Sequence, residues 1–113
     1  MIKIRKWDVF LANLNPSHGT EPGKVRPVVV VQSDLLNGSH FSTLICPIST
    51  STQPKAKILR VHLKENEAGL GKKSDVLVDQ MRAIDNRRLL RRLGKISSAS
   101  ASQLQENVLT ILT

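Results

Sequence analysis

The sequence is poor in the residue types on which several kinds of functional site depend. Its one cysteine, Cys46, cannot form an internal disulfide, which agrees with a reducing compartment. Tyrosine is absent, and Trp7, Phe10 and Phe41 are too few for a surface on which several bases stack. Cysteine pairs, a His-x-x-x-His spacing and clustered carboxylates are also missing, so we expect no metal site and no cofactor.

Long apolar segments are lacking as well. No run of about 20 apolar residues is present, and the N-terminal stretch MIKIRKWDVF has neither the apolar region nor the cleavage site of a signal peptide. We therefore expect a cytoplasmic protein without a membrane segment. At 113 residues the chain has the usual length of one domain, so residues 1–113 are predicted to form a single domain.

Positive charge is what the sequence has in excess. Its 17 Lys and Arg outnumber its 9 Asp and Glu, which gives a formal net charge of +8. Such a charge favours an anionic partner, which includes nucleic acid, an acidic protein and an anionic membrane surface. The membrane surface is the least favoured of the three, because no basic amphipathic helix with an aromatic face is present.

The apolar pattern predicts a series of short strands. Four consecutive valines, Val28 to Val31, are typical of a strand buried on both faces, and Pro27 marks its start because proline cannot donate to a sheet ladder. Alternation of apolar and polar residues favours further strands at 8–14, 43–49, 57–64 and 75–80. Strands at this spacing suggest an antiparallel, barrel-like sheet.

Two helices are predicted to follow the strands. Asp85 is a candidate N-cap for a short, arginine-rich helix over residues 86–93, which Gly94 ends. A capping box over residues 100–103 introduces a closing helix. Its apolar stripe consists of Leu104, Val108, Ile111 and Leu112. The predicted fold class is therefore mainly β with appended helices, built on a compact, SH3-like antiparallel sheet.

Arg26 stands between a glycine-bearing loop, residues 19–23, and the valine strand. A guanidinium held on a rigid scaffold offers directed donors and a permanent charge to a phosphate. RNA can be cleaved without metal by its own 2′-hydroxyl if the protein accepts a proton, stabilises the charge on phosphorus and protonates the leaving 5′-oxygen. Arginine suits the second of these tasks. Taken alone, however, Arg26 favours the simpler interpretation of a solvated charge.

Other side chains offer a hydroxyl or a base for the same chemistry. Ser49 or Thr50 can donate to a phosphate oxygen, although a run of hydroxyls is also typical of a polar loop. Glu21, Asp79 and His18 can accept a proton. Each also has a structural interpretation, as a loop charge, a hydrogen-bonding group at the end of a strand, and an incidental side chain respectively.

The remaining polar candidates are predicted to have no chemical role. His40 lies in a loop and His62 on the solvated face of a strand, so both are interpreted as incidental. Cys46 lies in an apolar run, which favours a packed thiol over a nucleophile. The arginines of residues 87–92 are typical of a solvated helix face, with RNA backbone contact as the alternative.

Motifs that occur in a fixed order along the chain add to this interpretation. They are DVF and LNP within 8–16, GTEPGKVRPVVV at 19–30, CPIST at 46–50 and VDQMRAID at 78–85. Each is weak alone, but together they cover nearly the whole chain. In this order they resemble the MazF/PemK (Kid) family of toxin endoribonucleases.

The resemblance implies a homodimer that cleaves single-stranded RNA at specific sequences without metal, leaving a 2′,3′-cyclic phosphate and a 5′-hydroxyl. A cognate antitoxin, usually acidic, would inhibit it by filling the RNA groove. By position, Arg26 matches the catalytic arginine, Ser49 the catalytic Thr or Ser with Thr50 beside it, and Glu21 a loop carboxylate. The RNA-binding candidates are His18, Thr20, Lys24, Asp79, Gln80 and Arg82.

The chain departs from the family pattern in the loop before the valine strand. Pro22 replaces the usual glutamine, and a histidine that some members carry at the position of Thr20 is replaced by His18 nearby, which leaves the general base open. Two other functions stay open beside RNA cleavage. A gyrase-binding toxin of the CcdB type shares the fold without needing Arg26, and a simple RNA-binding module would bind without turnover.

Overall fold

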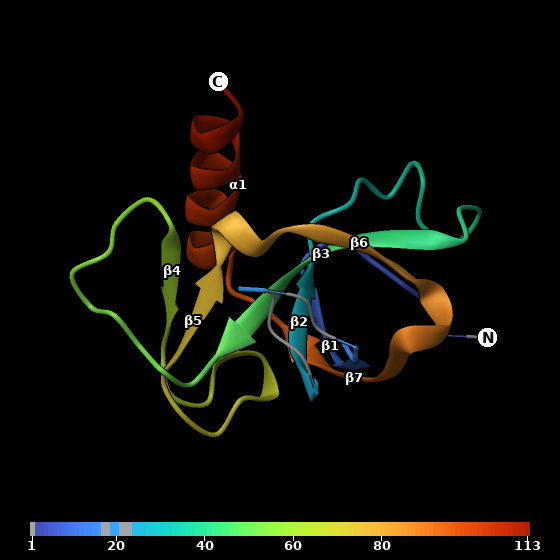
Figure 1. Ribbon diagram of the computed structural model, residues 1–113, viewed down its shortest axis with the longest axis horizontal. Coiled ribbons are helices and arrows are strands. Elements are labelled where there is room, and N and C mark those ends of the chain that lie inside the picture. Colours follow the sequence, from blue (N-terminus) through green and yellow to red (C-terminus); the bar gives the residue numbers. More distant parts are fainter. Residues whose placement is uncertain (1, 17–18, 21–23) are drawn as a thin grey trace.

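The chain folds into an antiparallel sheet that a C-terminal helix covers at one end (Figure 1). The structure, a computed structural model, describes residues 2–16, 19–20 and 24–113. In these ranges the strands are β1 (Asp8–Asn13), β2 (Val25–Val30), β3 (Ser42–Ser49), β4 (Arg60–Leu63), β5 (Ser74–Leu77), β6 (Arg82–Asp85) and β7 (Leu89–Lys95). The helical elements are the 3-10 turns η1 (Glu67–Gly69), η2 (Val78–Gln80) and η3 (Asn86–Arg88), and helix α1 (Ser98–Leu112).

The sheet has the order β4-β5-β3-β2-β1-β7, with β6 also paired to β3. Every pairing is antiparallel. The predicted fold class, mainly β with a C-terminal helix, is confirmed. The terminal strands of the order, β4 and β7, do not pair with each other within the described residues, so the sheet is not closed into a barrel.

Strand β3 is the strand around which the rest of the sheet is arranged. Its first half, up to Ile45, pairs with β6, and its second half, ending at Ser49, pairs with β5. Turn η2 carries the chain from one of these partners to the other, and β2 pairs along the opposite edge of β3. Segments that are far apart in the sequence therefore meet along one strand.

The valines of β2 pack into two apolar clusters, one on each face of the strand. The first cluster includes Val9, Val29, Cys46, Val76 and Leu104. The second includes Phe10, Val28, Val30, Ile45 and Leu89. Because successive strand residues point to opposite faces, this alternation confirms the prediction of a strand buried on both sides. Such a strand is held rigidly by its neighbours.

Cys46 is fully buried in the first cluster. Burial, and secondarily the charge of Asp79, raise the pKa of its thiol to about 12. Because the thiolate is the reactive form of cysteine, this side chain is chemically inert in the folded protein. The predicted packed core thiol is confirmed.

The predicted arginine-rich helix over residues 86–93 is wrong. Asp85 does cap a helical turn, accepting from the amide of Arg87 at 2.8 Å, but the turn lasts only through η3. The chain then continues as β7, because β1 presents a free ladder edge on which this segment forms backbone hydrogen bonds. The arginines have individual partners: Arg87 pairs with Asp85, and Arg92 with the buried Asp8.

Helix α1 begins three residues earlier than the predicted capping box. Its N-cap is Ser97, whose hydroxyl oxygen accepts from the amide of Ser100 at 3.1 Å. Its buried residues are Ala101, Leu104 and Asn107. Val108 is half-buried against the first cluster, as predicted, but the predicted stripe is wrong at Ile111 and Leu112, which are 37% and 65% exposed because the last turns extend past the sheet (Figure 1). No helix in the described part of the chain is long and apolar enough to cross a membrane.

Candidate functional site

A row of polar residues crosses four adjacent strands of the sheet. Val28 lies opposite Pro47, and this register, continued by two residues, brings Arg26 of β2 opposite Ser49 of β3. Ser49 lies opposite Asp75 of β5, and Asp75 opposite His62 of β4. Side chains directly opposite each other in an antiparallel sheet share a face. The observed pairings connect a hydroxyl, a carboxylate and an imidazole across β3, β5 and β4, and the extended register of β2 projects a guanidinium onto the same face.

Arg26 is held between two strands within the sheet. It lies opposite the buried Ala12 of β1, on the face where Val28 continues into the second cluster. The prediction that Arg26 stands where the valine strand starts is confirmed, although β2 begins one residue before it, at Val25. The side chain is half-buried, so it is anchored at its stem and still reaches the surface.

Ser49 and Thr50 belong to opposite faces of the sheet. Ser49 is the last residue of β3, and its hydroxyl oxygen accepts from the amide of Ser51 at 3.0 Å. Thr50 is exposed and lines a shallow hollow with Lys72 and Arg91, on the face to which Ile48 points. Only the first of the two predicted hydroxyls thus shares a face with Arg26.

The loop before β2 is tied down at its base, beside Arg26. The amide of Lys24 donates to the side-chain oxygen of Asn15 at 2.6 Å, and the amide of Leu14 donates to the carbonyl of Lys24 at 2.8 Å. Arg88 donates to the carbonyl of Asn13 at 3.0 Å and also to that of Asn15. This arginine therefore has a structural task.

Lys24 and Thr20 are both exposed on that loop. The other two predicted loop residues, His18 and Glu21, fall outside the described residues. Lys24 precedes Arg26 by two residues. Two cationic residues therefore come from the start of β2.

The remaining predicted RNA-binding residues follow the other edge of β3. Asp79 is exposed and Gln80 half-buried in η2, and the half-buried Arg82 opens β6. Arg82 pairs with Ile45, four residues along β3 from Ser49, which corresponds to about 13 Å at the usual rise per residue. The β2–β3 register therefore projects Arg26 and Ser49 onto one face at the same end of the two strands, and this second group lies farther along β3.

Asp75 is a buried charge that the sequence interpretation missed. Its carboxylate accepts from the amide of Gln53 at 2.7 Å and from Arg60 Nη1 at 3.2 Å, and its Oδ1 lies 2.7 Å from His62 Nδ1. A buried carboxylate requires such partners. The feature that could have indicated this buried charge is an acidic residue inside β5, a strand whose four residues are all buried.

His62 is therefore not the incidental side chain that its alternation predicted. Its ring is 43% exposed, yet the other ring nitrogen, Nε2, lies 2.8 Å from the carbonyl oxygen of Ala56. The hydrogen bond to Asp75 raises the pKa of His62 above its ordinary value. Within the described ranges, no three His, Cys, Asp or Glu side chains are grouped as metal ligands would be.

Comparison with known proteins identifies the family. A sequence model of the PemK-like, MazF-like toxins of type II toxin-antitoxin systems matches residues 5–112, and the chain belongs to this family. Three solved structures illustrate the shared fold. MazF from Deinococcus radiodurans is 24% identical, with a TM-score of 0.83 over 99% of this chain and 98% of that chain.

The other two structures come from mycobacteria. The Mycobacterium tuberculosis toxin MazF-mt6 is 20% identical, with a TM-score of 0.77 over 93% of this chain and 95% of that chain. A mycobacterial endoribonuclease, solved in complex with its cognate antitoxin, is 16% identical, with a TM-score of 0.76 over 99% of this chain and 95% of that chain. At these identities the likeness shows a common fold.

Proposed function

We propose that residues 1–113 form a toxin domain that cleaves single-stranded RNA at specific sequences, as a metal-independent endoribonuclease of the cytoplasm. The observation that carries this proposal is the pairing of β2 with β3, whose register, extended by two residues, projects Arg26 opposite Ser49 on one face of the sheet. Membership of the MazF-like toxin family and the net charge of +8 support it. A charged donor beside a hydroxyl donor suits a phosphate that gains negative charge during reaction.

In the proposed reaction the 2′-hydroxyl of RNA attacks the adjacent phosphorus, and the bond from phosphorus to the 5′-oxygen breaks. The products are a 2′,3′-cyclic phosphate and a 5′-hydroxyl. Arg26 donates to the phosphoryl oxygens and stabilises the extra negative charge. It is also the proposed proton donor to the leaving 5′-oxygen, because an alkoxide is a much stronger base than guanidine. Glu21 is the candidate acceptor of the 2′-hydroxyl proton.

Ser49 is the proposed hydroxyl donor to the phosphate, in preference to Thr50. It shares a face with Arg26, while Thr50 lines a hollow on the other face. The amide of Ser51 occupies one lone pair of the Ser49 oxygen, so the hydroxyl proton points away from that amide. The remaining candidates for RNA contact are His18, Thr20, Lys24, Asp79, Gln80 and Arg82. In this proposal the RNA bound at Arg26 continues along β3 toward Arg82.

The proposed partners besides RNA are an acidic antitoxin and a second copy of the chain. The net charge of +8 suits an acidic inhibitor. Leu35 and Phe41, between β2 and β3, are 91% and 87% exposed and are the apolar side chains proposed to contact the second copy. Sedimentation equilibrium at micromolar concentration is expected to give twice the 12.5 kDa chain mass. A monomer at that concentration would count against the dimer.

The function itself is tested by incubating the pure protein and EDTA with a long RNA of mixed sequence, then mapping the new ends. We expect cuts at a recurring short sequence, with cyclic phosphate and 5′-hydroxyl ends. Absence of cleavage together with blocked DNA supercoiling would indicate a gyrase-binding toxin of the CcdB type. RNA binding without turnover would indicate a simple binding module.

A further inference from the structure

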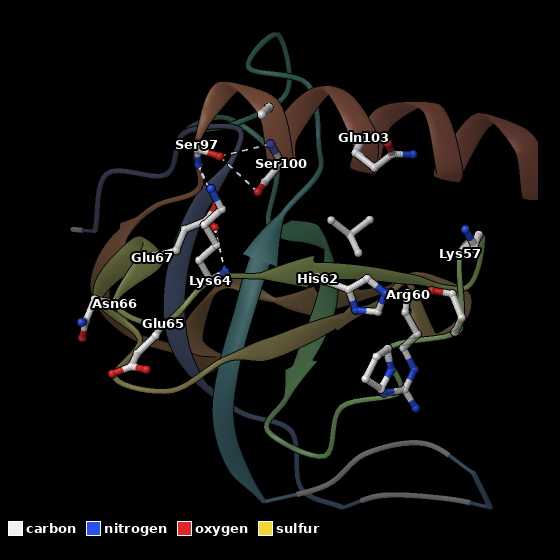
Figure 2. A pocket seen from close by; sticks show the side chains of 14 residues that line it. Lys57, Arg60, His62, Lys64, Glu65, Asn66, Glu67, Ser97, Ser100 and Gln103 are labelled. Atoms are coloured by element: carbon white, nitrogen blue, oxygen red, sulfur yellow. Dashed lines mark hydrogen bonds between the residues drawn. The ribbon is translucent and has the colours of Figure 1, made fainter.

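The buried Asp75 forms a clasp with Arg60 and His62, two residues of β4. Its Oδ2 accepts from Arg60 Nη1 at 3.2 Å, and its Oδ1 lies 2.7 Å from His62 Nδ1. Figure 2 shows Arg60 and His62 next to each other on β4, beside the hollow that separates this strand from α1. We call these three residues the Asp75 clasp. It lies in the same cross-strand row as Ser49.

The clasp binds the exposed segment that follows the two hydroxyl residues, residues 51–56. It contacts this segment at successive backbone groups. Arg60 Nη1 donates to the carbonyl of Ser51 at 2.9 Å, and the amide of Gln53 donates to the Asp75 carboxylate at 2.7 Å. His62 Nε2 lies 2.8 Å from the carbonyl oxygen of Ala56. A segment without regular secondary structure is thus fastened along most of its length.

Ser51 connects the clasp to the hydroxyl of the candidate site. Its carbonyl is bound by Arg60, and its amide donates to the hydroxyl oxygen of Ser49. A shift of Ser51 would therefore turn the Ser49 hydroxyl. Because a misplacement of about 1 Å can cost 100-fold in rate, such a connection matters for a donor in the transition state.

We propose that the Asp75 clasp positions the Ser49 hydroxyl opposite Arg26, and that it does so only while His62 carries a proton on both ring nitrogens. This inference rests on the proposed RNA cleavage. Its first part follows from the contacts of Ser51. The three clasp residues are positioning residues, since they act through Ser49.

The protonation of His62 follows from what its two nitrogens face. Nδ1 faces a carboxylate and Nε2 a carbonyl, and both of these groups are acceptors. A neutral imidazole has one N–H and satisfies only one of them, whereas the imidazolium satisfies both. The charged groups around the ring are Asp75 from β5 and Arg60 from β4, and α1 contributes the uncharged Ser100 and Gln103 to the hollow. Lys57, Lys64, Glu65 and Glu67 line the same hollow.

The direction of the pH effect follows from the pKa of His62. The hydrogen bond to Asp75 raises this pKa most, and the Ala56 carbonyl and the charge of Asp75 add to it, while burial and Arg60 oppose it. A raised pKa in the folded state means that the clasp is complete below the ordinary pKa of histidine. It is lost as the pH rises through the raised value. Cleavage should therefore weaken on the alkaline side.

The test compares His62→Gln with His40→Gln over a range of pH. His62 is partly exposed, so its replacement is compatible with folding, and His40 is an exposed loop histidine outside the clasp. We expect His62→Gln to lower kcat about 10- to 100-fold below the ordinary pKa of histidine, with KM within about twofold. The decrease of kcat at alkaline pH, which we assign to His62, should be absent in this variant. His40→Gln should match the wild type in kcat, KM and pH profile.

Nuclear magnetic resonance of the imidazole nitrogens examines the clasp without RNA. We expect the pKa of His62 to lie above the ordinary value of histidine, with both of its ring nitrogens protonated below that ordinary value. Asp75→Asn, which keeps the shape of the side chain, should lower the pKa of His62 toward the ordinary value of histidine. If the wild type cleaves RNA, and His62→Gln has the same kcat and the same decrease of kcat at alkaline pH, the inference about the clasp is overturned while the proposed function stands. A wild type that cleaves no RNA would overturn the proposed function.

Discussion

Replacing Arg26 by alanine is expected to lower kcat for RNA cleavage by about 10³-fold or more, the effect known for donors and arginines that act on a transition-state phosphoryl group. Arg26 is half-buried in a strand that both neighbouring strands hold in place, so no other side chain can take its position. Single-turnover cleavage of a short RNA that contains one mapped site measures the change. Arg26→Lys should recover only part of the rate, because an ammonium lacks the bidentate geometry.

Arg87→Ala is the matched control for this variant. It removes the same charge from a side chain that is 91% exposed and paired with Asp85 at 3.0 Å, outside the Arg26–Ser49 row. Both variants lose the same long-range attraction for RNA, so a difference between them reports on chemistry. If Arg26→Ala retained cleavage within about tenfold of Arg87→Ala, Arg26 would be a binding residue and its catalytic role would have to be abandoned.

Replacing Gly69 by alanine is expected to lower the free energy of unfolding by about 2–4 kcal/mol. The loss has two causes, because alanine is strained in the left-handed backbone conformation of Gly69 and its Cβ would overpack a backbone contact. Gly69 has φ +77°, and an added Cβ would lie 2.2 Å from the carbonyl oxygen of Leu93 in β7. The contact is reciprocal, since a Cβ on Gly94 would lie 2.6 Å from the carbonyl carbon of Ala68. The contact between η1 and β7 is therefore made by backbone atoms, which cannot move aside by a change of rotamer as a side chain could.

Thermal unfolding at one fixed protein concentration measures this effect. A loss of this size should lower Tm by about 8–16 °C in a chain of this length. Gly71→Ala is the control, because an added Cβ there meets nothing within 4 Å. Its effect should stay within about 0.5 kcal/mol. Equal stability of the Gly69 and Gly71 variants would show that η1 and β7 are not packed as described.

Strands β1 to β5 could be predicted from local pattern, whereas β6 and the arginine-rich β7 could not. The alternation along β4 and the run of valines that begins at Val28 in β2 each leave a signal in a few neighbouring positions. Asp85 gives the same capping signal for a 3-10 turn as for an α-helix. Whether the chain continues as a helix after Arg88 depends on the free edge of β1, which is 75 residues away at Asn13. Pairing with β1 therefore determines that this segment is a strand, β7, and not a helix.

The candidate site was predictable to a similar extent. The position of Arg26 at the start of a buried strand follows from its own neighbours in the sequence. That Ser49, and not Thr50, shares its face depends on the register between β2 and β3. The pairing of His62 with Asp75 likewise depends on the register between β4 and β5, and the alternation around His62 indicates only that its face is solvated. An acidic residue among buried apolar neighbours was the one local sign of that pairing.

The central claim is that the 2′-hydroxyl of RNA is the attacking group at a site built on Arg26 and Ser49. The most direct test is an RNA with two copies of the mapped cleavage sequence, one of which carries a single deoxynucleotide on the 5′ side of the cut bond. Cleavage in EDTA should continue at the all-ribose copy and stop at the deoxy copy. Continued cutting at the deoxy copy would contradict the account, because no 2′-hydroxyl is present there to attack.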